Sequence, residues 1–141
     1  MSLSRLPESD AHRIVDALLE ADEFDPRIFY HFTPYRFTRF RESNLLHEFA
    51  DETSAPLFRE EYPEDYEMQV RLRLGRVLDV SGRSKPEGYV DPDDRARCRE
   101  WMDKQGIDTL IIDSNYTGKD YIVKSTDQIK IVSITAPKPP L

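Results

Sequence analysis

The stretch that decides the fold class runs from residue 108 to residue 134, DTLIIDSNYTGKDYIVKSTDQIKIVSI. It holds three short runs of apolar and β-branched residues, at 108–113, 121–124 and 129–134. The last two runs are separated by STDQ, four residues that favour turns. Three strands in succession, with no helix between them, indicate a mostly antiparallel sheet rather than the strand–helix alternation of a doubly wound fold.

A helix is predicted immediately before this stretch, over residues 92–105. Asp91 followed by Pro92 offers a cap and a first-turn proline, which are typical of a helix start. Gly106 stands where a left-handed residue commonly ends a helix. The stripe expected to be buried consists of Cys98, Trp101 and Met102.

The segment EMQVRLRLGRVLDV, residues 67–80, has the clearest period of two in the chain. We expect one long strand, with Gly75 interrupting the alternation as a bulge would. Its basic face, which includes Arg71 and Arg73, fits either a solvated strand surface or ligands for a pyrophosphate. The apolar face consists of Met68, Val70, Leu72 and Leu74.

The N-terminal half supplies the remaining elements. Residues 9–23 predict an amphipathic helix, and IFYHF at 28–32 predicts a strand that Pro34 ends. Residues 44–62 indicate a short strand or loop and then a short helix. The sum is an α+β domain at 27–135, with an N-terminal helical extension at 1–26 and a proline-rich tail at 136–141.

Composition limits the classes of partner. The chain has 141 residues with 20 basic and 27 acidic side chains, a net charge of −7, which disfavours attraction of the whole surface to nucleic acid or anionic membranes. A single cysteine, Cys98, excludes an internal disulfide and a multi-cysteine metal site. The first ten residues lack an apolar signal core, and no apolar run reaches the ~20 residues of a membrane span, so we expect a cytoplasmic protein without a membrane partner.

Five motifs in order resemble those of ADP-ribosyltransferase-like domains, most closely the small versions of phage and polyvalent proteins. The first, YHFTPYRFTRF at 30–40, is similar to a Tyr-His-Gly-Thr signature followed by two phenylalanines three residues apart. The second, EFADETSAPLFREEY at 48–62, resembles an aromatic residue before an alanine-containing helix. The other three are MQVRLRLGRVLDVSG at 68–82, GIDTLIID at 106–113 and DYIVKSTDQIKIV at 120–132.

The resemblance implies a split sheet with flanking helices around a cleft that binds NAD⁺, and no metal. It assigns the hydroxyls of the adenosine-side ribose to His31, whose ring nitrogens donate or accept hydrogen bonds, with Thr33 supporting that contact or fixing the strand end. A histidine packed under a loop is the structural alternative for His31. Phe32 would offer its backbone to the nicotinamide amide, with its ring pointing away, and Arg36 would reach a phosphate.

Phe49 would stack on the nicotinamide ring, which as a pyridinium favours an aromatic face. Core packing explains Phe49 equally well, and Tyr30 or Tyr35 offers an alternative ring.

The position that usually holds a catalytic glutamate in the family matches Gln128 here. A neutral amide orients a ribose but supplies no negative charge, so a carboxylate elsewhere, Asp113 or Asp120, would stabilise the oxocarbenium-like transition state. We expect His31, Phe49 and Gln128 to line one pocket.

The function implied by the resemblance is an NAD-dependent mono-ADP-ribosyltransferase, a phage or bacterial effector that modifies a macromolecular acceptor, protein rather than nucleic acid. Arginine is disfavoured as the acceptor side chain, because Thr126 replaces the first glutamate of the Glu-x-Glu pair found in arginine-modifying members. The alternative is a catalytically inactive domain of the same fold with a binding or inhibitory role, which Gln128 and Phe32 favour. A nucleic-acid-binding module is a third possibility that the net charge opposes.

Overall fold

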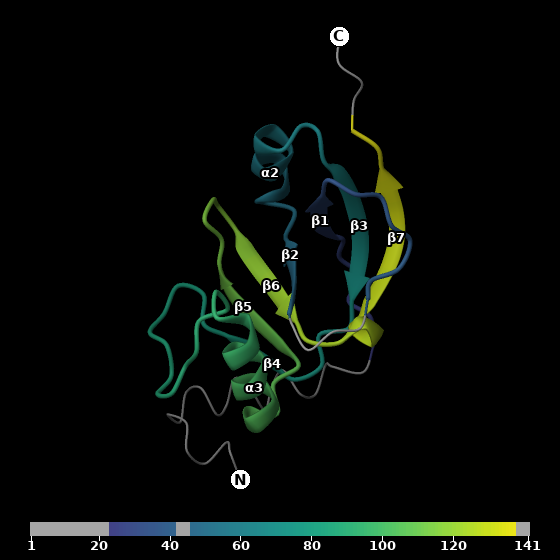
Figure 1. Cartoon of the computed structure of the whole chain (residues 1–141). Coiled ribbons are helices and arrows are strands. Elements are labelled where there is room, and N and C mark those ends of the chain that lie inside the picture. The colour runs from purple at the N-terminus through teal and green to yellow at the C-terminus, as the bar shows by residue number, and fades with distance from the viewer. Residues whose placement is uncertain (1–22, 42–45, 138–141) are drawn as a thin grey trace.

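The computed structural model describes residues 23–41 and 46–137, which form one sheet with two α-helices and a short 3-10 helix (Figure 1). The sheet has seven strands in the order β4-β5-β6-β2-β1-β3-β7. Every pairing is antiparallel except that of β4 with β5. The strands are β1 (Phe29–Thr33), β2 (His47–Ala50), β3 (Tyr66–Leu72), β4 (Val77–Asp79), β5 (Thr109–Asp113), β6 (Lys119–Val123) and β7 (Ile129–Thr135), and the helices are α2 (Ala55–Glu61), α3 (Arg95–Gln105) and the 3-10 helix η2 (Thr126–Gln128). The expected α+β class with a mostly antiparallel sheet is confirmed.

The sheet is weakest at its middle, where β1 meets β2. That ladder contains one residue pair, Tyr30 opposite Ala50, whereas the other ladders contain three to six pairs. Figure 1 shows β4, β5 and β6 inclined to β1, β3 and β7 on the two sides of this junction. The sheet therefore consists of a four-stranded wing (β4-β5-β6-β2) and a three-stranded wing (β1-β3-β7) joined by a narrow contact.

Two hydrophobic clusters hold these wings. One cluster packs α3 on the four-stranded wing, through buried side chains such as Cys98, Met102 and Leu110. The other lies around the junction and joins the three-stranded wing to β2, β5 and β6. It consists of Phe29, Phe40, Phe49, Met68, Val70, Leu72, Ile111, Tyr121 and Val123.

The single long strand expected over residues 67–80 is wrong. β3 ends at Leu72, β4 begins at Val77, and the two belong to different wings. Gly75 turns the chain with φ +65°, and a Cβ there would lie 2.4 Å from Oδ2 of Asp108. The bulge lies instead within β3, where its register against β7 shifts between residues 69 and 70.

The helix expected over residues 92–105 is confirmed at its C-terminal end, and it begins three residues after the expected start. Residues 91–94 form a turn, in which the Asp94 backbone N–H donates to the Asp91 carbonyl at 3.1 Å, and α3 begins at Arg95. Gly106 ends it with φ +70°. Two residues of the expected stripe, Cys98 and Met102, are fully buried, and Trp101 is half-buried.

Two expectations fall partly or wholly outside the described residues. The helix expected at 9–23 lies almost entirely beyond the part of the chain that the structure describes, and so do the last four residues of the tail. Within residues 23–41 and 46–137, no helix has the length and apolar character to cross a bilayer.

Candidate functional site

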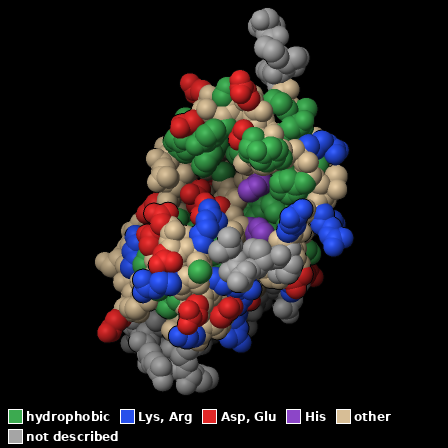
Figure 2. Space-filling model, viewed as in Figure 1, with side chains coloured by type: hydrophobic (Ala, Val, Ile, Leu, Met, Phe, Trp, Pro, Cys, Tyr) green, Lys and Arg blue, Asp and Glu red, His purple; other side chains and the backbone are tan. Residues whose placement is uncertain are grey.

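A cavity of about 510 Å³ lies where the two wings meet. Strands β1, β2 and β6 contribute to its wall, together with α2 and the first residue of α3. Figure 2 shows a hollow on this face, bordered by hydrophobic and histidine side chains on one side and by charged side chains on the other. The lining residues are Tyr30, His31, Phe32, Phe37, Phe40, Leu46, His47, Glu48, Phe49, Ala50, Phe58, Tyr62, Asp65, Arg95 and Asp120.

His31 lies in this cavity as the sequence predicts. Its Nδ1 is 3.1 Å from the carbonyl oxygen of Glu48, and because a carbonyl only accepts, Nδ1 carries the proton. Burial lowers the pKa of His31, so the imidazole is neutral near pH 7. A neutral ring protonated on Nδ1 presents Nε2 as a hydrogen-bond acceptor, the property needed to hold a ribose hydroxyl.

Asp120 brings a carboxylate into the same cavity from β6, where it pairs with Ala50 of β2. Burial raises its pKa to about 6, and the neighbouring negative charges of Glu48 and Asp51 add to the rise. The carboxylate is therefore mostly ionised at neutral pH, although its surroundings disfavour the negative charge. Asp113 is the other carboxylate that the sequence offers for stabilising the transition state. It is exposed, lies outside this cavity and accepts the Gly82 backbone N–H at 2.9 Å.

Asp51 fixes the backbone next to Asp120. Its Oδ1 accepts the Ser54 backbone N–H, and its Oδ2 accepts the Lys119 backbone N–H, each at 2.9 Å. Gly118 lies so close that a Cβ there would be 2.4 Å from Oδ1 of Asp51. The carboxylate thus ties the end of β2 and the start of α2 to the residue that precedes Asp120.

Aromatic side chains form another part of the wall. The rings of Phe32 and Phe58 stack with centroids 5.5 Å apart and an angle of 11°, and Tyr62 stacks on Phe58 at 6.3 Å. All three residues line the cavity. We expected the Phe32 ring to point away from the ligand. It stacks instead on Phe58, a ring of the cavity wall.

The other predicted ligand residues divide between wall and framework. Thr33 is buried off the cavity wall, and its Oγ1 accepts the Tyr35 backbone N–H at 3.2 Å, which fixes the strand end. Phe49 reaches the wall but is only 1% exposed, so its ring is chiefly core. Tyr30 lines the cavity, whereas Tyr35 and Arg36 are exposed and lie outside it.

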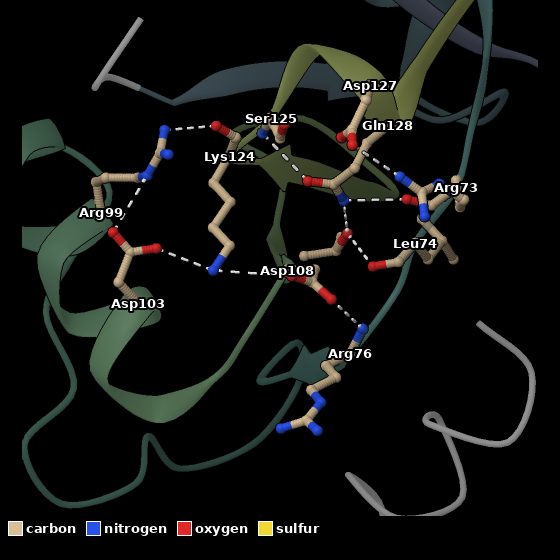
Figure 3. A network of polar contacts seen from close by, with 11 residues as sticks. Arg73, Leu74, Arg76, Arg99, Asp103, Asp108, Lys124, Ser125, Asp127 and Gln128 are labelled. Atoms are coloured by element: carbon tan, nitrogen blue, oxygen red, sulfur yellow. Dashed lines mark hydrogen bonds and ion pairs between the residues drawn. The ribbon is translucent and has the colours of Figure 1, made fainter. Parts of the chain in front are cut away.

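Gln128 does not join His31 and Phe49, so the expectation of one shared pocket is wrong. Its side chain lines a separate cavity of about 410 Å³. Figure 3 shows the Gln128 amide enclosed by polar groups: Oε1 accepts the Ser125 backbone N–H at 3.2 Å, and Nε2 donates to the Arg73 carbonyl at 3.0 Å and to Thr109 Oγ1 at 3.1 Å. With 4% exposure, this amide connects the starts of β5 and β7 to the end of β3.

The cations around Gln128 are paired with carboxylates. Arg73 lies 3.1 Å from Asp127, and Lys124 lies 2.9 Å from Asp103 and 3.7 Å from Asp108 (Figure 3). The Lys124 ammonium is the main reason that the pKa of Asp103 is lowered. This surface is therefore a neutralised network that attaches α3 to the turn before β7.

Sequence reasoning did not single out Phe58, Tyr62, Asp65 or Arg95 for the cavity. Phe58 and Tyr62 lie four residues apart at the end of α2, a helical spacing that could have marked them as one aromatic face. No local signal identifies Arg95, because its position depends on how α3 packs on the sheet.

Comparison with protein-family models, with curated proteins and with solved structures finds no match for this chain.

Proposed function

We propose that this chain is an NAD⁺-dependent mono-ADP-ribosyltransferase that modifies a protein acceptor. The observation that carries the proposal is the presence of His31 and Asp120 in one cavity, at the narrow junction of a divided sheet. The sequence resemblance supplies the reaction class, and the geometry supplies residues with the required chemistry.

The reaction breaks the bond between nicotinamide and ribose, so that positive charge develops on the ribose while nicotinamide leaves with the bonding electrons. A nucleophilic side chain of the acceptor protein then forms a bond to the same ribose carbon and loses its proton to water. The Asp120 carboxylate supplies negative charge near that centre, the role expected of an acidic group facing an oxocarbenium-like transition state. Nε2 of His31 accepts a hydrogen bond from a hydroxyl of the adenosine-side ribose and so holds the dinucleotide in the cavity. The aromatic wall formed by Phe32, Phe58 and Tyr62 offers flat surface to the pyridinium ring.

This assignment places the negative charge on Asp120 and not on Gln128. Both belong to the fifth motif, eight residues apart, but the Gln128 amide is satisfied inside the protein. We propose that Gln128 supports the turn before β7.

A protein acceptor fits the charge of the cavity better than a nucleic acid does. Glu48, Asp65 and Asp120 line it, and the whole chain carries a net charge of −7. These carboxylates repel a phosphate backbone and tolerate a neutral or basic polypeptide.

The test is incubation of the chain with labelled NAD⁺ and a cell lysate, with measurement of nicotinamide release and of label transfer to protein. Asp120→Asn should lower nicotinamide release by about 10²–10³-fold, because it removes one preorganised charge at the reacting centre. His31→Ala should weaken NAD⁺ binding by about 1–2 kcal/mol through loss of a hydrogen bond. The control is Asp113→Asn, which changes a carboxylate outside the cavity and should leave both quantities at the wild-type level.

Wild-type rates in Asp120→Asn, or no nicotinamide release by the wild type, would contradict the proposed activity. The second outcome, combined with binding of ADP-ribose, would support the alternative of an inactive binding domain. Phe32 favours that alternative, since its ring occupies the cavity wall where the resembled family has a glycine.

A further inference from the structure

Arg95 provides the cavity's single Lys or Arg side chain among the residues that the structure describes. It is the first residue of α3, and its guanidinium reaches the cavity from the four-stranded wing. Nη1 donates to the Leu46 carbonyl at 3.0 Å, and Nη2 lies 3.5 Å from Oε1 of Glu48. The group is thus held by two neighbours that themselves line the cavity.

Two features indicate that this guanidinium serves a ligand rather than the helix. A guanidinium has five N–H donors, so the contacts with Leu46 and Glu48 leave donors for a planar, bidentate acceptor. Arg95 is also the one Lys or Arg among the described residues that line the cavity, so it supplies the positive charge beside three carboxylates.

We infer that Arg95 binds a phosphate of the ligand and makes the cavity selective for nucleotides that carry a diphosphate over nucleosides that carry none. The inference rests on the proposed function, because that function requires the cavity to take a dinucleotide. A phosphate at Arg95 competes with Glu48 for the guanidinium, whereas phosphates near Asp65 and Asp120 are only repelled, so Arg95 also sets which end of the ligand lies against α3. The nicotinamide end, which carries positive charge, is left to the carboxylates and the aromatic wall.

The experiment measures binding of ADP-ribose and of adenosine by calorimetry, together with nicotinamide release from NAD⁺. Arg95→Gln removes the positive charge and retains a polar amide side chain. It should weaken ADP-ribose binding roughly tenfold or more, the cost of losing charge-assisted hydrogen bonds, and leave adenosine binding unchanged. Arg95→Lys keeps a point charge without the fork and should give an intermediate loss.

The matched control is Arg97→Gln, on the same helix. Arg97 is 74% exposed, lies outside the cavity and contacts Asp94 at 3.4 Å, so its loss should change neither ligand's affinity. An equal loss of ADP-ribose and adenosine binding in Arg95→Gln would overturn the inference, because it would show a structural role. Unchanged ADP-ribose binding in Arg95→Gln would overturn it as well.

The outcomes separate this inference from the proposed function. Binding of ADP-ribose that depends on Arg95, without nicotinamide release, supports the inference and overturns the transferase. Nicotinamide release that Arg95→Gln leaves at the wild-type kcat/KM overturns the inference and supports the transferase. A wild type that neither binds ADP-ribose nor releases nicotinamide from NAD⁺ overturns both.

Discussion

Asp120→Asn should make the protein more stable while it removes the proposed activity. The pKa of Asp120 is raised from 3.8 to about 6 in the folded protein, chiefly by burial. The folded state therefore holds the proton more tightly than the unfolded state does. The free energy of unfolding falls as the pH rises from about 4 to about 6, and it stays lowered above that range. An uncharged asparagine avoids this cost.

The magnitude follows from the pKa change. A difference of about two units corresponds to roughly 3 kcal/mol if it acts in full, at about 1.4 kcal/mol for each unit. Asp120 is only partly buried, and solvent screening reduces the effect, so we expect a gain of about 1 kcal/mol at neutral pH. The gain should shrink in acid, where the wild-type carboxyl is protonated in the folded state.

Urea denaturation at about pH 7.5 and about pH 5 measures this difference directly. Asp113→Asn is the control, because Asp113 is exposed and its Oδ2 accepts the Gly82 backbone N–H. It should give no gain at either pH. A lower stability of Asp120→Asn than of wild type at the higher pH, or a gain that grows in acid, would refute the reasoning. Either result would mean that the Asp120 charge is stabilised by its surroundings.

The remaining predictions concern the framework of the site. Gln128→Glu should lower the free energy of unfolding by about 1–3 kcal/mol, because a carboxylate cannot donate to the two buried acceptors of the amide. Asp127→Asn, a change at the exposed neighbouring residue, should lower it far less. Equal denaturation midpoints for the two variants would contradict the role given to Gln128. Gly118→Ala should cost about 1–3 kcal/mol and reduce nicotinamide release, because it forces Asp51 away and strains a residue with φ +88°. Gly82→Ala is the control for backbone strain alone, because Gly82 has φ +66° and nothing lies within 4 Å of the added Cβ. If Gly82→Ala lowers the melting temperature as much as Gly118→Ala does, Asp51 is not involved.

The sequence predicted the strands better than their arrangement. Runs of β-branched and aromatic residues identified β1, β5, β6 and β7, because such side chains pack well on a half-buried pleated surface. The division of residues 67–80 between the two wings could not be predicted. It depends on Asp108, thirty-three residues from Gly75, whose side chain accepts the Arg76 backbone N–H at 2.9 Å and excludes a Cβ at Gly75.

The site was predictable in part for a similar reason. The motif predicted that His31 lies in the cavity, because a signature of consecutive residues on one strand keeps its local geometry wherever the strand lies. The choice between Asp120 and Gln128 depends on which end of the fifth motif lies beside β2, and that is a property of sheet order. The match at Gln128 led to the segment that lines the cavity through Asp120, whereas Gln128 itself lines a separate cavity.

The sheet order also sets a constraint on synthesis. β3 lies between β1 and β7, and its partner β7 is made more than fifty residues later, after β4, α3, β5 and β6. Until the ribosome has released residues 129–135, β3 presents an unpaired edge with buried-type side chains at Met68, Val70 and Leu72. Such an edge pairs readily with other chains. Pairing of β7 with β3 thus completes the sheet, and we expect a chain truncated before residue 129 to aggregate rather than to fold as a smaller protein.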